Sequence, residues 1–100
     1  MKPSFNERCY NILKKVPRGK VTTYREIAKV LGSKAYRAVG NAMNKNPFPG
    51  SKVPCHRVVK SNGEVGGFAS GTEKKILMLK EEGIEISNGK IDLDRFFHKF

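Results

Sequence analysis

Residues 23–44 read TYREIAKVLGSKAYRAVGNAMN, and this stretch decides the fold because it encodes two short helices separated by a tight turn. Thr23 followed by Glu26 forms a capping box that opens the first helix. Gly32 ends that helix, and Ser33 can cap the next one. Two short helices joined by a glycine-containing turn are typical of a helix-turn-helix.

The second helix of this pair has a polar side opposite its apolar side. The polar side carries cationic, amide and phenolic groups, which suit phosphates and base edges. Its members are Lys34, Tyr36, Arg37, Asn41 and Asn44. We add Thr23, at the start of the first helix, to the candidate DNA contacts. Many helical hairpins bind no DNA, so this pattern needs support from the rest of the chain.

Composition gives that support. The chain has 100 residues, with 20 Lys and Arg against 9 Asp and Glu, and a formal net charge of +11. An excess this large favours a polyanionic partner, although a Lys-rich surface that serves only solubility is the alternative. No apolar run approaches the roughly 20 residues of a membrane span, and residues 1–7 lack the apolar core of a signal peptide. Two distant cysteines, Cys9 and Cys55, do not form a disulfide framework, so we expect a reduced, cytoplasmic location.

The remaining segments predict a mainly α domain with short β elements, of the winged-helix-like helix-turn-helix class. A capping box at Ser4 opens an N-terminal helix in which Cys9 lies on the apolar stripe as a structural cysteine. Another helix begins at Thr72 and ends at Gly83. We expect one domain over residues 1–100, with a core over 5–83 and a tail over 84–100. In the tail, Asn88-Gly89 predicts a hairpin, and a short terminal helix follows.

Residues 54–59 read PCHRVV and carry the most reactive pair in the chain. A thiol attacks as its thiolate, and a nearby imidazole is a common proton acceptor for it. Neighbouring side chains on an extended strand point to opposite faces, so Cys55 and His56 need either a turn in the backbone or a bridging water. Glu82 is placed at a helix C-terminus, against the dipole preference, which indicates a partner; an ordinary solvated glutamate is the alternative.

Other chemistries have weaker support. Residues 66–71 are rich in glycine, and their backbone can approach a planar ligand closely, but they do not form a phosphate-binding loop of the GxxxxGK type. The possible metal ligands, Cys9, Cys55, His56 and His98, lack the close pairs of structural zinc sites. A cysteine hydrolase would need a substrate cleft and an oxyanion loop, and no segment is identifiable as either.

Five segments in the expected order resemble the O6-alkylguanine-DNA alkyltransferases (methylated-DNA–protein-cysteine methyltransferases). They are VTTYREIA at 21–28, YRAVGNAM at 36–43, KNP at 45–47, PCHRVV at 54–59 and EEG at 81–83. The resemblance runs from about residue 5 to residue 83. It implies a protein that acts on double-stranded DNA containing O6-alkylguanine, without a cofactor or metal and as a monomer.

The resemblance also implies roles for individual residues. Cys55 is the expected alkyl acceptor, and His56 removes its proton through a water. Glu82 holds that imidazole in the proton-accepting tautomer. Asn46 matches the hinge asparagine that fixes the helix against the active-site segment. Tyr24 is expected to donate a proton or hydrogen bond to the guanine ring as charge develops on the leaving base.

Arg37 matches the finger that enters the base stack when the alkylated guanine is flipped out. The substrate pocket is expected to include residues of the PCHRVV segment and of the glycine-rich loop. They are Val58, Gly67, Phe68, Ala69 and Ser70. Ala69 stands where a serine hydroxyl commonly contacts O6, which leaves backbone amides to stabilise that atom.

A second departure concerns format. Most members of the family carry an N-terminal domain, whereas a lone domain with a tail is similar to alkyltransferase-like proteins, which bind alkylguanine and recruit repair partners. Those proteins usually replace the reactive cysteine, and here Cys55 is retained. The sequence therefore predicts irreversible transfer of one alkyl group per chain, with non-catalytic lesion binding as the alternative.

Overall fold

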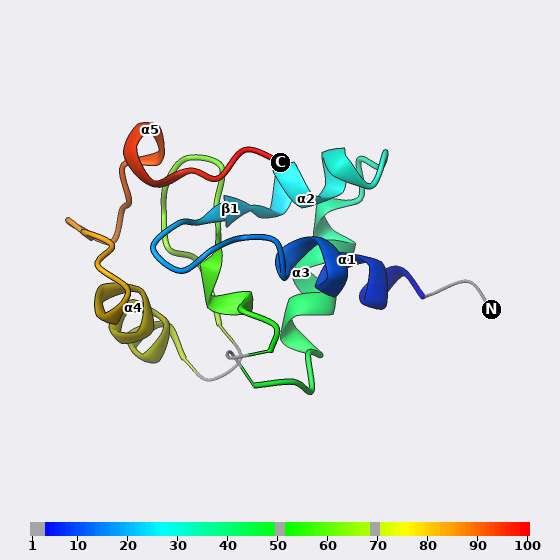
Figure 1. Cartoon of the computed structure of the whole chain (residues 1–100), viewed down its shortest axis with the longest axis horizontal. Helices are drawn as coiled ribbons and strands as arrows, with labels where there is room; N and C mark the ends of the chain where they lie inside the picture. Colours follow the sequence, from blue (N-terminus) through cyan, green and yellow to red (C-terminus); the bar gives the residue numbers. More distant parts are fainter. Residues whose placement is uncertain (1–3, 50–51, 69–70) are drawn as a thin grey trace.

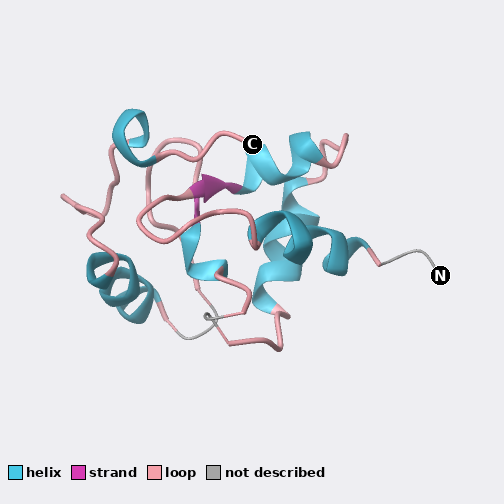
Figure 2. Ribbon diagram, viewed as in Figure 1, coloured by secondary structure: helices cyan, strands magenta, loops and turns pink. Residues whose placement is uncertain are grey.

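The computed structural model describes residues 4–49, 52–68 and 71–100, and is mainly helical with one small sheet (Figures 1 and 2). In chain order the elements are α1 (Phe5–Leu13), β1 (Thr22–Thr23), α2 (Tyr24–Val30), α3 (Tyr36–Asn44), the 3-10 helix η1 (Cys55–Arg57), β2 (Val58–Val59), α4 (Thr72–Glu81) and α5 (Leu93–Phe96). The predicted class, mainly α with short β elements and a helix-turn-helix, is confirmed. No helix among these elements is long and apolar enough to cross a membrane.

Local capping chemistry sets two of the helix starts. The Ser4 hydroxyl accepts a hydrogen bond from the Glu7 amide at 3.1 Å, and the Thr23 hydroxyl accepts one from the Glu26 amide at 3.0 Å. Both capping boxes are thus confirmed at the N-cap position.

The predicted cap of the third helix is wrong. The Ser33 hydroxyl accepts a hydrogen bond from the Ala35 amide at 3.0 Å, two residues along, and so stabilises the turn before the helix. Helix α3 begins at Tyr36, with Ala35 as an N-cap residue that makes no side-chain hydrogen bond. The connection between α2 and α3 is therefore longer than the sequence predicted.

The sheet joins the two halves of the chain. β1 and β2 are parallel, with Thr22 opposite Val58 and Thr23 opposite Val59. The C-terminal segment continues the pairing, because the Val21 amide donates to Phe96 O at 2.9 Å and the His98 amide donates to Val21 O at 2.8 Å. In Figure 1 this segment, in red, runs past β1 and ends beside α2.

The tail contains the predicted turn and terminal helix. Asn88 and Gly89 both have positive φ, 52° and 72°, and reciprocal backbone hydrogen bonds join Ser87 and Lys90. This geometry suits an Asn-Gly hairpin turn. The pairing beyond the turn is short, because Lys90 also bridges to Glu64 outside the tail. Helix α5 is the short terminal helix.

The buried apolar side chains form two clusters that meet at the sheet. One cluster packs α1, α2 and α3 together and includes Val53 and Val58. The other contains Val59 with side chains from α4 and the tail, including Leu79 and Ile91. β2 thus contributes one valine to each cluster, and η1, directly before it, lies where the two clusters meet.

Candidate active site

The reactive pair lies on a turn of 3-10 helix, not on a strand. The Arg57 amide donates to Pro54 O at 2.9 Å, and the turn ends at Val58, where β2 begins. The backbone therefore turns at Cys55 and His56, which is the first of the two arrangements that the sequence left open. Cys55 is partly exposed, whereas His56 is only 3% exposed.

The His56 imidazole has one occupied nitrogen and one free nitrogen. Its Nε2 lies 2.6 Å from Glu82 Oε2, and its buried Nδ1 has no hydrogen-bond partner in the part of the chain described. A carboxylate only accepts, so the Nε2 atom carries the proton and Nδ1 presents a lone pair. Burial lowers the pKa of His56, and this effect outweighs that of Glu82, which raises the pKa. The lowered pKa favours the neutral ring.

Glu82 is held as a carboxylate by several donors. Arg57 donates from Nε to Oε1 and from Nη2 to Oε2, both at 2.8 Å, and the Gly19 amide donates to Oε1 at 3.3 Å. Burial by itself would raise the pKa of Glu82. The hydrogen bonds from Arg57, His56 and Gly19 outweigh that effect and lower the pKa from 4.5 to about 2. The prediction that Glu82 has a partner is confirmed.

Arg57 is the first residue of this network that the sequence did not predict. Besides its two bonds to Glu82, its Nη1 donates to Val16 O at 2.9 Å, so the guanidinium connects η1 to the segment after α1 and to the end of α4. The planar fork of an arginine suits such two-point contacts. Its place next to His56 in the PCHRVV segment was the available signal.

Lys75 is the second missed residue, and it is 0% exposed. Its Nζ donates to Val58 O at 2.6 Å and to Gly67 O at 3.1 Å, and lies 5.7 Å from the centre of the Tyr24 ring. Burial lowers the pKa of Lys75 to about 8, although the charge of Cys55 acts in the opposite direction. A sequence signal existed, because Lys75 lies four residues before the buried Leu79 and shares its face of α4.

Tyr24, at the start of α2, faces the same loop. Its hydroxyl donates to Gly67 O over a long 3.5 Å. Burial raises the pKa of Tyr24, and the charge of Cys55 adds to this, so the phenol keeps its proton at neutral pH. The structure thus brings a phenolic donor and an ammonium group to one carbonyl of the glycine-rich loop.

Asn46 connects the end of α3 to the segment that leads to Cys55. Its Nδ2 donates to Val53 O at 3.3 Å, and its Oδ1 accepts from the Phe48 amide at 2.9 Å. These bonds fit the hinge role that the resemblance implied, although its effect on the reaction stays a prediction.

The remaining predicted site residues are distributed as follows. Val58 is buried in the core, and Gly67 is exposed beside a partly buried Phe68, while Ala69 and Ser70 lie outside the described residues. The predicted DNA contacts on and before α3 are exposed: Lys34, Tyr36, Arg37 and Asn41. Thr23 is 5% exposed, and its hydroxyl is used to cap α2. The contacts of all five with DNA stay predictions.

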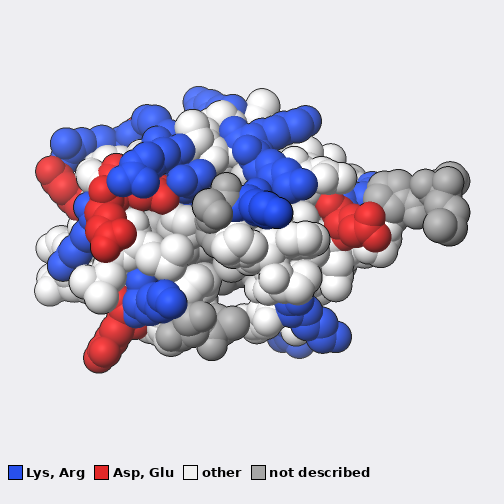
Figure 3. All heavy atoms as spheres, turned by 60° about the horizontal axis from the view of Figure 1, so that its bottom comes forward, with Lys and Arg blue, Asp and Glu red and all other residues white. Residues whose placement is uncertain are grey.

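Basic side chains gather on one part of the surface. Figure 3 shows Lys and Arg gathered along the upper edge of one face, with fewer Asp and Glu between them. A cleft of about 1050 Å³ opens between α2, the turn before α3 and residues 60–62, and Tyr24 lines it.

A family model described as "6-O-methylguanine DNA methyltransferase, DNA binding domain" matches residues 4–84. The chain belongs to this methyltransferase family.

Relatives of known name agree with this membership. A "Methylated-DNA--protein-cysteine methyltransferase" of Methanosarcina acetivorans is 50% identical over 79% of this chain and 51% of its own length. A "Bifunctional methyltransferase/endonuclease" of Picrophilus torridus is 43% identical over 91% of this chain and 31% of its own length. The chain thus spans about a third to a half of these methyltransferase relatives.

A solved structure matches over the whole chain. S. pombe Atl1, in complex with damaged DNA containing O6-carboxymethylguanine, aligns with a TM-score of 0.87 and 33% identity, covering 100% of both chains. The tail, which lies beyond residues 4–84 matched by the family model, therefore falls within the part of the chain that aligns with this solved structure.

Proposed function

We propose that this protein repairs O6-alkylguanine in double-stranded DNA by transferring the alkyl group irreversibly to Cys55. The observation that carries the proposal is the state of His56, whose Nε2 is bound to Glu82 while its buried Nδ1 has no partner among the described residues. A base with one nitrogen oriented by a carboxylate and the other free is the arrangement used to activate an adjacent nucleophile.

The transfer step follows from these groups. His56 Nδ1 takes the thiol proton of Cys55, through a water, and the resulting thiolate attacks the alkyl carbon. The new S–C bond forms as the C–O6 bond breaks, and the electron pair moves to the guanine. The imidazolium is stabilised by Glu82, whose low pKa keeps it ionised throughout. The products are a thioether on Cys55 and an unmodified guanine.

The negative charge that develops on the leaving guanine must be neutralised by a proton or stabilised by a hydrogen-bond donor. Tyr24 supplies its phenolic proton or a hydrogen bond, because its raised pKa keeps the hydroxyl protonated. Among the described residues that hydroxyl has one hydrogen bond, the long 3.5 Å contact with Gly67 O, which a bound base can replace at little cost.

The base must leave the duplex before its O6 substituent reaches Cys55. Helix α3 presents an exposed Arg37, which would enter the space in the stack and offset part of the unstacking cost. The excess of 20 basic over 9 acidic residues would supply phosphate contacts, so binding should weaken steeply with salt.

The reaction consumes the protein, because a thioether is not readily hydrolysed. Cys9, the other thiol, is 0% exposed in the core and cannot relieve Cys55. We propose a monomer that needs no cofactor or metal, works in the cytoplasm and turns over once.

Intact-protein mass spectrometry tests the proposal. The protein is incubated with a duplex containing O6-methylguanine, and the modified residue is found by peptide mapping. We expect one methyl group per chain, on Cys55, with none on Cys55→Ser and full labelling of the matched thiol control Cys9→Ala. Methylation of Cys55→Ser, or release of free product over repeated turnovers, would contradict the proposal.

Lesion binding without transfer is the second candidate, favoured by the match with S. pombe Atl1 over 100% of both chains. It predicts tight binding to the modified duplex with no mass change on Cys55. In that case the damaged base would be marked for a repair partner.

A further inference from the structure

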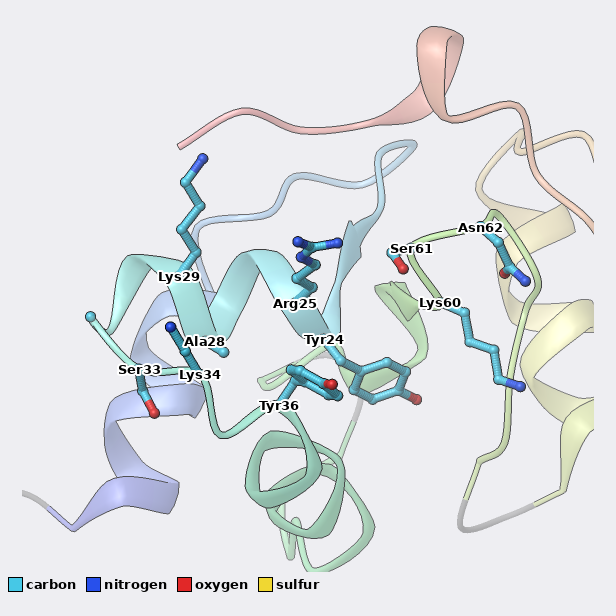
Figure 4. A pocket seen from close by; sticks show the side chains of 11 residues that line it. Tyr24, Arg25, Ala28, Lys29, Ser33, Lys34, Tyr36, Lys60, Ser61 and Asn62 are labelled. Atoms are coloured by element: carbon cyan, nitrogen blue, oxygen red, sulfur yellow. The ribbon is translucent and has the colours of Figure 1, made fainter.

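The cleft beside the reactive site is lined by aromatic and cationic side chains, most of which have no role in the transfer step. It lies between α2 and residues 60–62, and its side chains come from both sides (Figure 4). Two tyrosines and four cations line it: Tyr24, Tyr36, Arg25, Lys29, Lys34 and Lys60. None of the described residues that line it is acidic, although the Glu64 carboxylate lies 3.6 Å from the ammonium of Lys60, which does line it.

Tyr36 is a candidate DNA contact to which no part of the DNA has yet been assigned. It is the first residue of α3 and is 53% exposed, more than most aromatic side chains of its size would be in a packed fold. Its neighbour Arg37 has a proposed role in base flipping, and Tyr24 has one in proton donation. Tyr36 and Tyr24 are the two aromatic side chains among those that Figure 4 shows lining the cleft.

The chemistry of the cleft matches a nucleotide. Aromatic rings stack on nucleobases of any identity, and lysine and arginine neutralise the adjoining phosphates. Tyr24 belongs both to the cleft and to the reactive site, because it lines the cleft and its hydroxyl donates to Gly67 O. The volume, about 1050 Å³, is of the size that holds a small organic ligand.

We propose that this cleft binds a nucleotide adjacent to the flipped guanine, with Tyr36 stacked on its base and Lys29 or Lys60 beside its phosphate. This inference rests on the proposed function, because it assumes that a guanine is flipped into the neighbouring site. It gives Tyr36 a role in substrate binding that is separate from the transfer chemistry of Cys55. In this arrangement the stacked base is drawn partly out of the duplex. When that base is missing, Tyr36 has nothing to stack on.

The test is a mutant cycle between Tyr36 and the neighbouring bases. Affinities are measured by fluorescence anisotropy in the Cys55→Ser background, so that no transfer occurs, on duplexes that carry O6-methylguanine. One duplex is intact, and two others have an abasic residue on the 5′ or the 3′ side of the lesion. Tyr36→Ala is compared with Tyr36→Phe, which keeps the ring, and with Val30→Ala, which shortens an exposed apolar side chain of α2 that does not line the cleft.

We expect Tyr36→Ala to weaken binding to the intact duplex by about 5- to 150-fold, the range of one base–aromatic stack. Tyr36→Phe and Val30→Ala should bind like the parent protein. On one of the two abasic duplexes, Tyr36→Ala should cause no further loss. Unchanged affinity of Tyr36→Ala, or an equal loss on all three duplexes, would overturn the proposal. Methylation of Cys55 in the wild-type chain is measured separately, so failure of the transfer reaction is distinguishable from failure of this stacking interaction.

Discussion

Arg57 donates to both carboxylate oxygens of Glu82, through Nε–Oε1 and Nη2–Oε2 hydrogen bonds of 2.8 Å each. The Glu82 side chain is 5% exposed and that of Arg57 is 14% exposed, so this ion pair is shielded from water. The same carboxylate binds the imidazole of His56. The orientation of the proposed base therefore depends on an arginine that does not touch it in this network.

Removing Arg57 should destabilise the fold far more than removing a surface arginine. Arg57→Met leaves Glu82 buried without its strongest donor, and breaking a buried pair in this way costs about 3–5 kcal/mol of unfolding free energy. The control, Arg95→Met, removes an exposed pair with Glu85, which should cost less than about 1 kcal/mol. Urea unfolding followed by circular dichroism measures both, and equal losses would show that the buried pair is not structurally important.

The Glu82–His56 contact should control the rate of transfer. In Glu82→Gln the amide can donate to Nε2, which stabilises the tautomer with the proton on Nδ1 and removes the proton acceptor. We expect methylation of Cys55 to slow by about 10²–10⁴-fold, the usual contribution of a general base. The control is Glu81→Gln, which changes the adjacent exposed carboxylate and should react normally.

Affinity for the modified duplex separates this effect from a loss of binding. It should stay nearly unchanged in Glu82→Gln, because the carboxylate is buried away from the expected DNA surface. A rate equal to that of the wild-type protein would remove Glu82 from the mechanism.

Local sequence patterns predicted the parts of this fold that depend on near neighbours. The caps at Ser4 and Thr23 and the Asn88-Gly89 turn each involve groups within a few residues. Ser33 was assigned wrongly because its hydroxyl could bond either to a helix or to the turn before it, and only the packing of α3 decides between them.

The site was predictable in part for the same reason. The unfavourable place of Glu82 at a helix end correctly indicated a partner, but not that Arg57, 25 residues away, would be one. Lys75 was missed because a lysine is rarely buried without a carboxylate, and its carbonyl partners are fixed only by the tertiary fold. The 3-10 turn at Cys55 was likewise hidden by a β-prone composition.

Acid should destabilise the protein through Glu82. Its pKa is about 2 in the folded protein against 4.5 ordinarily, so the unfolded chain binds the proton first as the pH falls. The stability that Glu82 contributes is complete above pH 4.5 and is lost between 4.5 and 2, by about 3 kcal/mol. His56, with a lowered pKa, acts in the same direction from pH 6.5 downward.

Urea unfolding at several pH values tests this linkage. The difference in unfolding free energy between the wild-type protein and Glu82→Gln should shrink as the pH falls from 4.5 to 2. A constant difference over that range would mean that Glu82 titrates normally in the folded protein.

Lys75 should make the stability of the protein depend on pH in the alkaline range. Between its folded pKa of about 8 and its ordinary value of 10.5, the unfolded chain holds more protons, so stability rises with pH. Tyr10, Tyr24 and Cys9, with raised pKa values, act against this rise. The comparison with Lys75→Met isolates the lysine, since the other three groups are common to both proteins.

We expect the wild-type protein to gain up to about 3 kcal/mol relative to Lys75→Met between pH 8 and 10.5. At pH 7 the variant should already differ in stability, because Val58 O and Gly67 O lose a donor. Parallel pH profiles for the two proteins would contradict the assignment of a lowered pKa to Lys75.

Arg37 should matter for duplex substrates and not for the free base. Arg37→Ala removes the side chain expected to fill the stack, and unstacking costs a few kcal/mol, so transfer from duplex O6-methylguanine should slow by about tenfold or more. Transfer from the free O6-methylguanine base should be unchanged, because nothing has to be flipped. Lys45→Ala, at the opposite end of α3, is the charge control. Both variants lose one cation. If that cation binds a phosphate, its removal should reduce the salt slope of DNA binding by about 1. Only Arg37→Ala should slow transfer from the duplex while leaving transfer from the free base unchanged. Equal losses on duplex and free base would show that Arg37 acts on the reaction itself and not on base flipping.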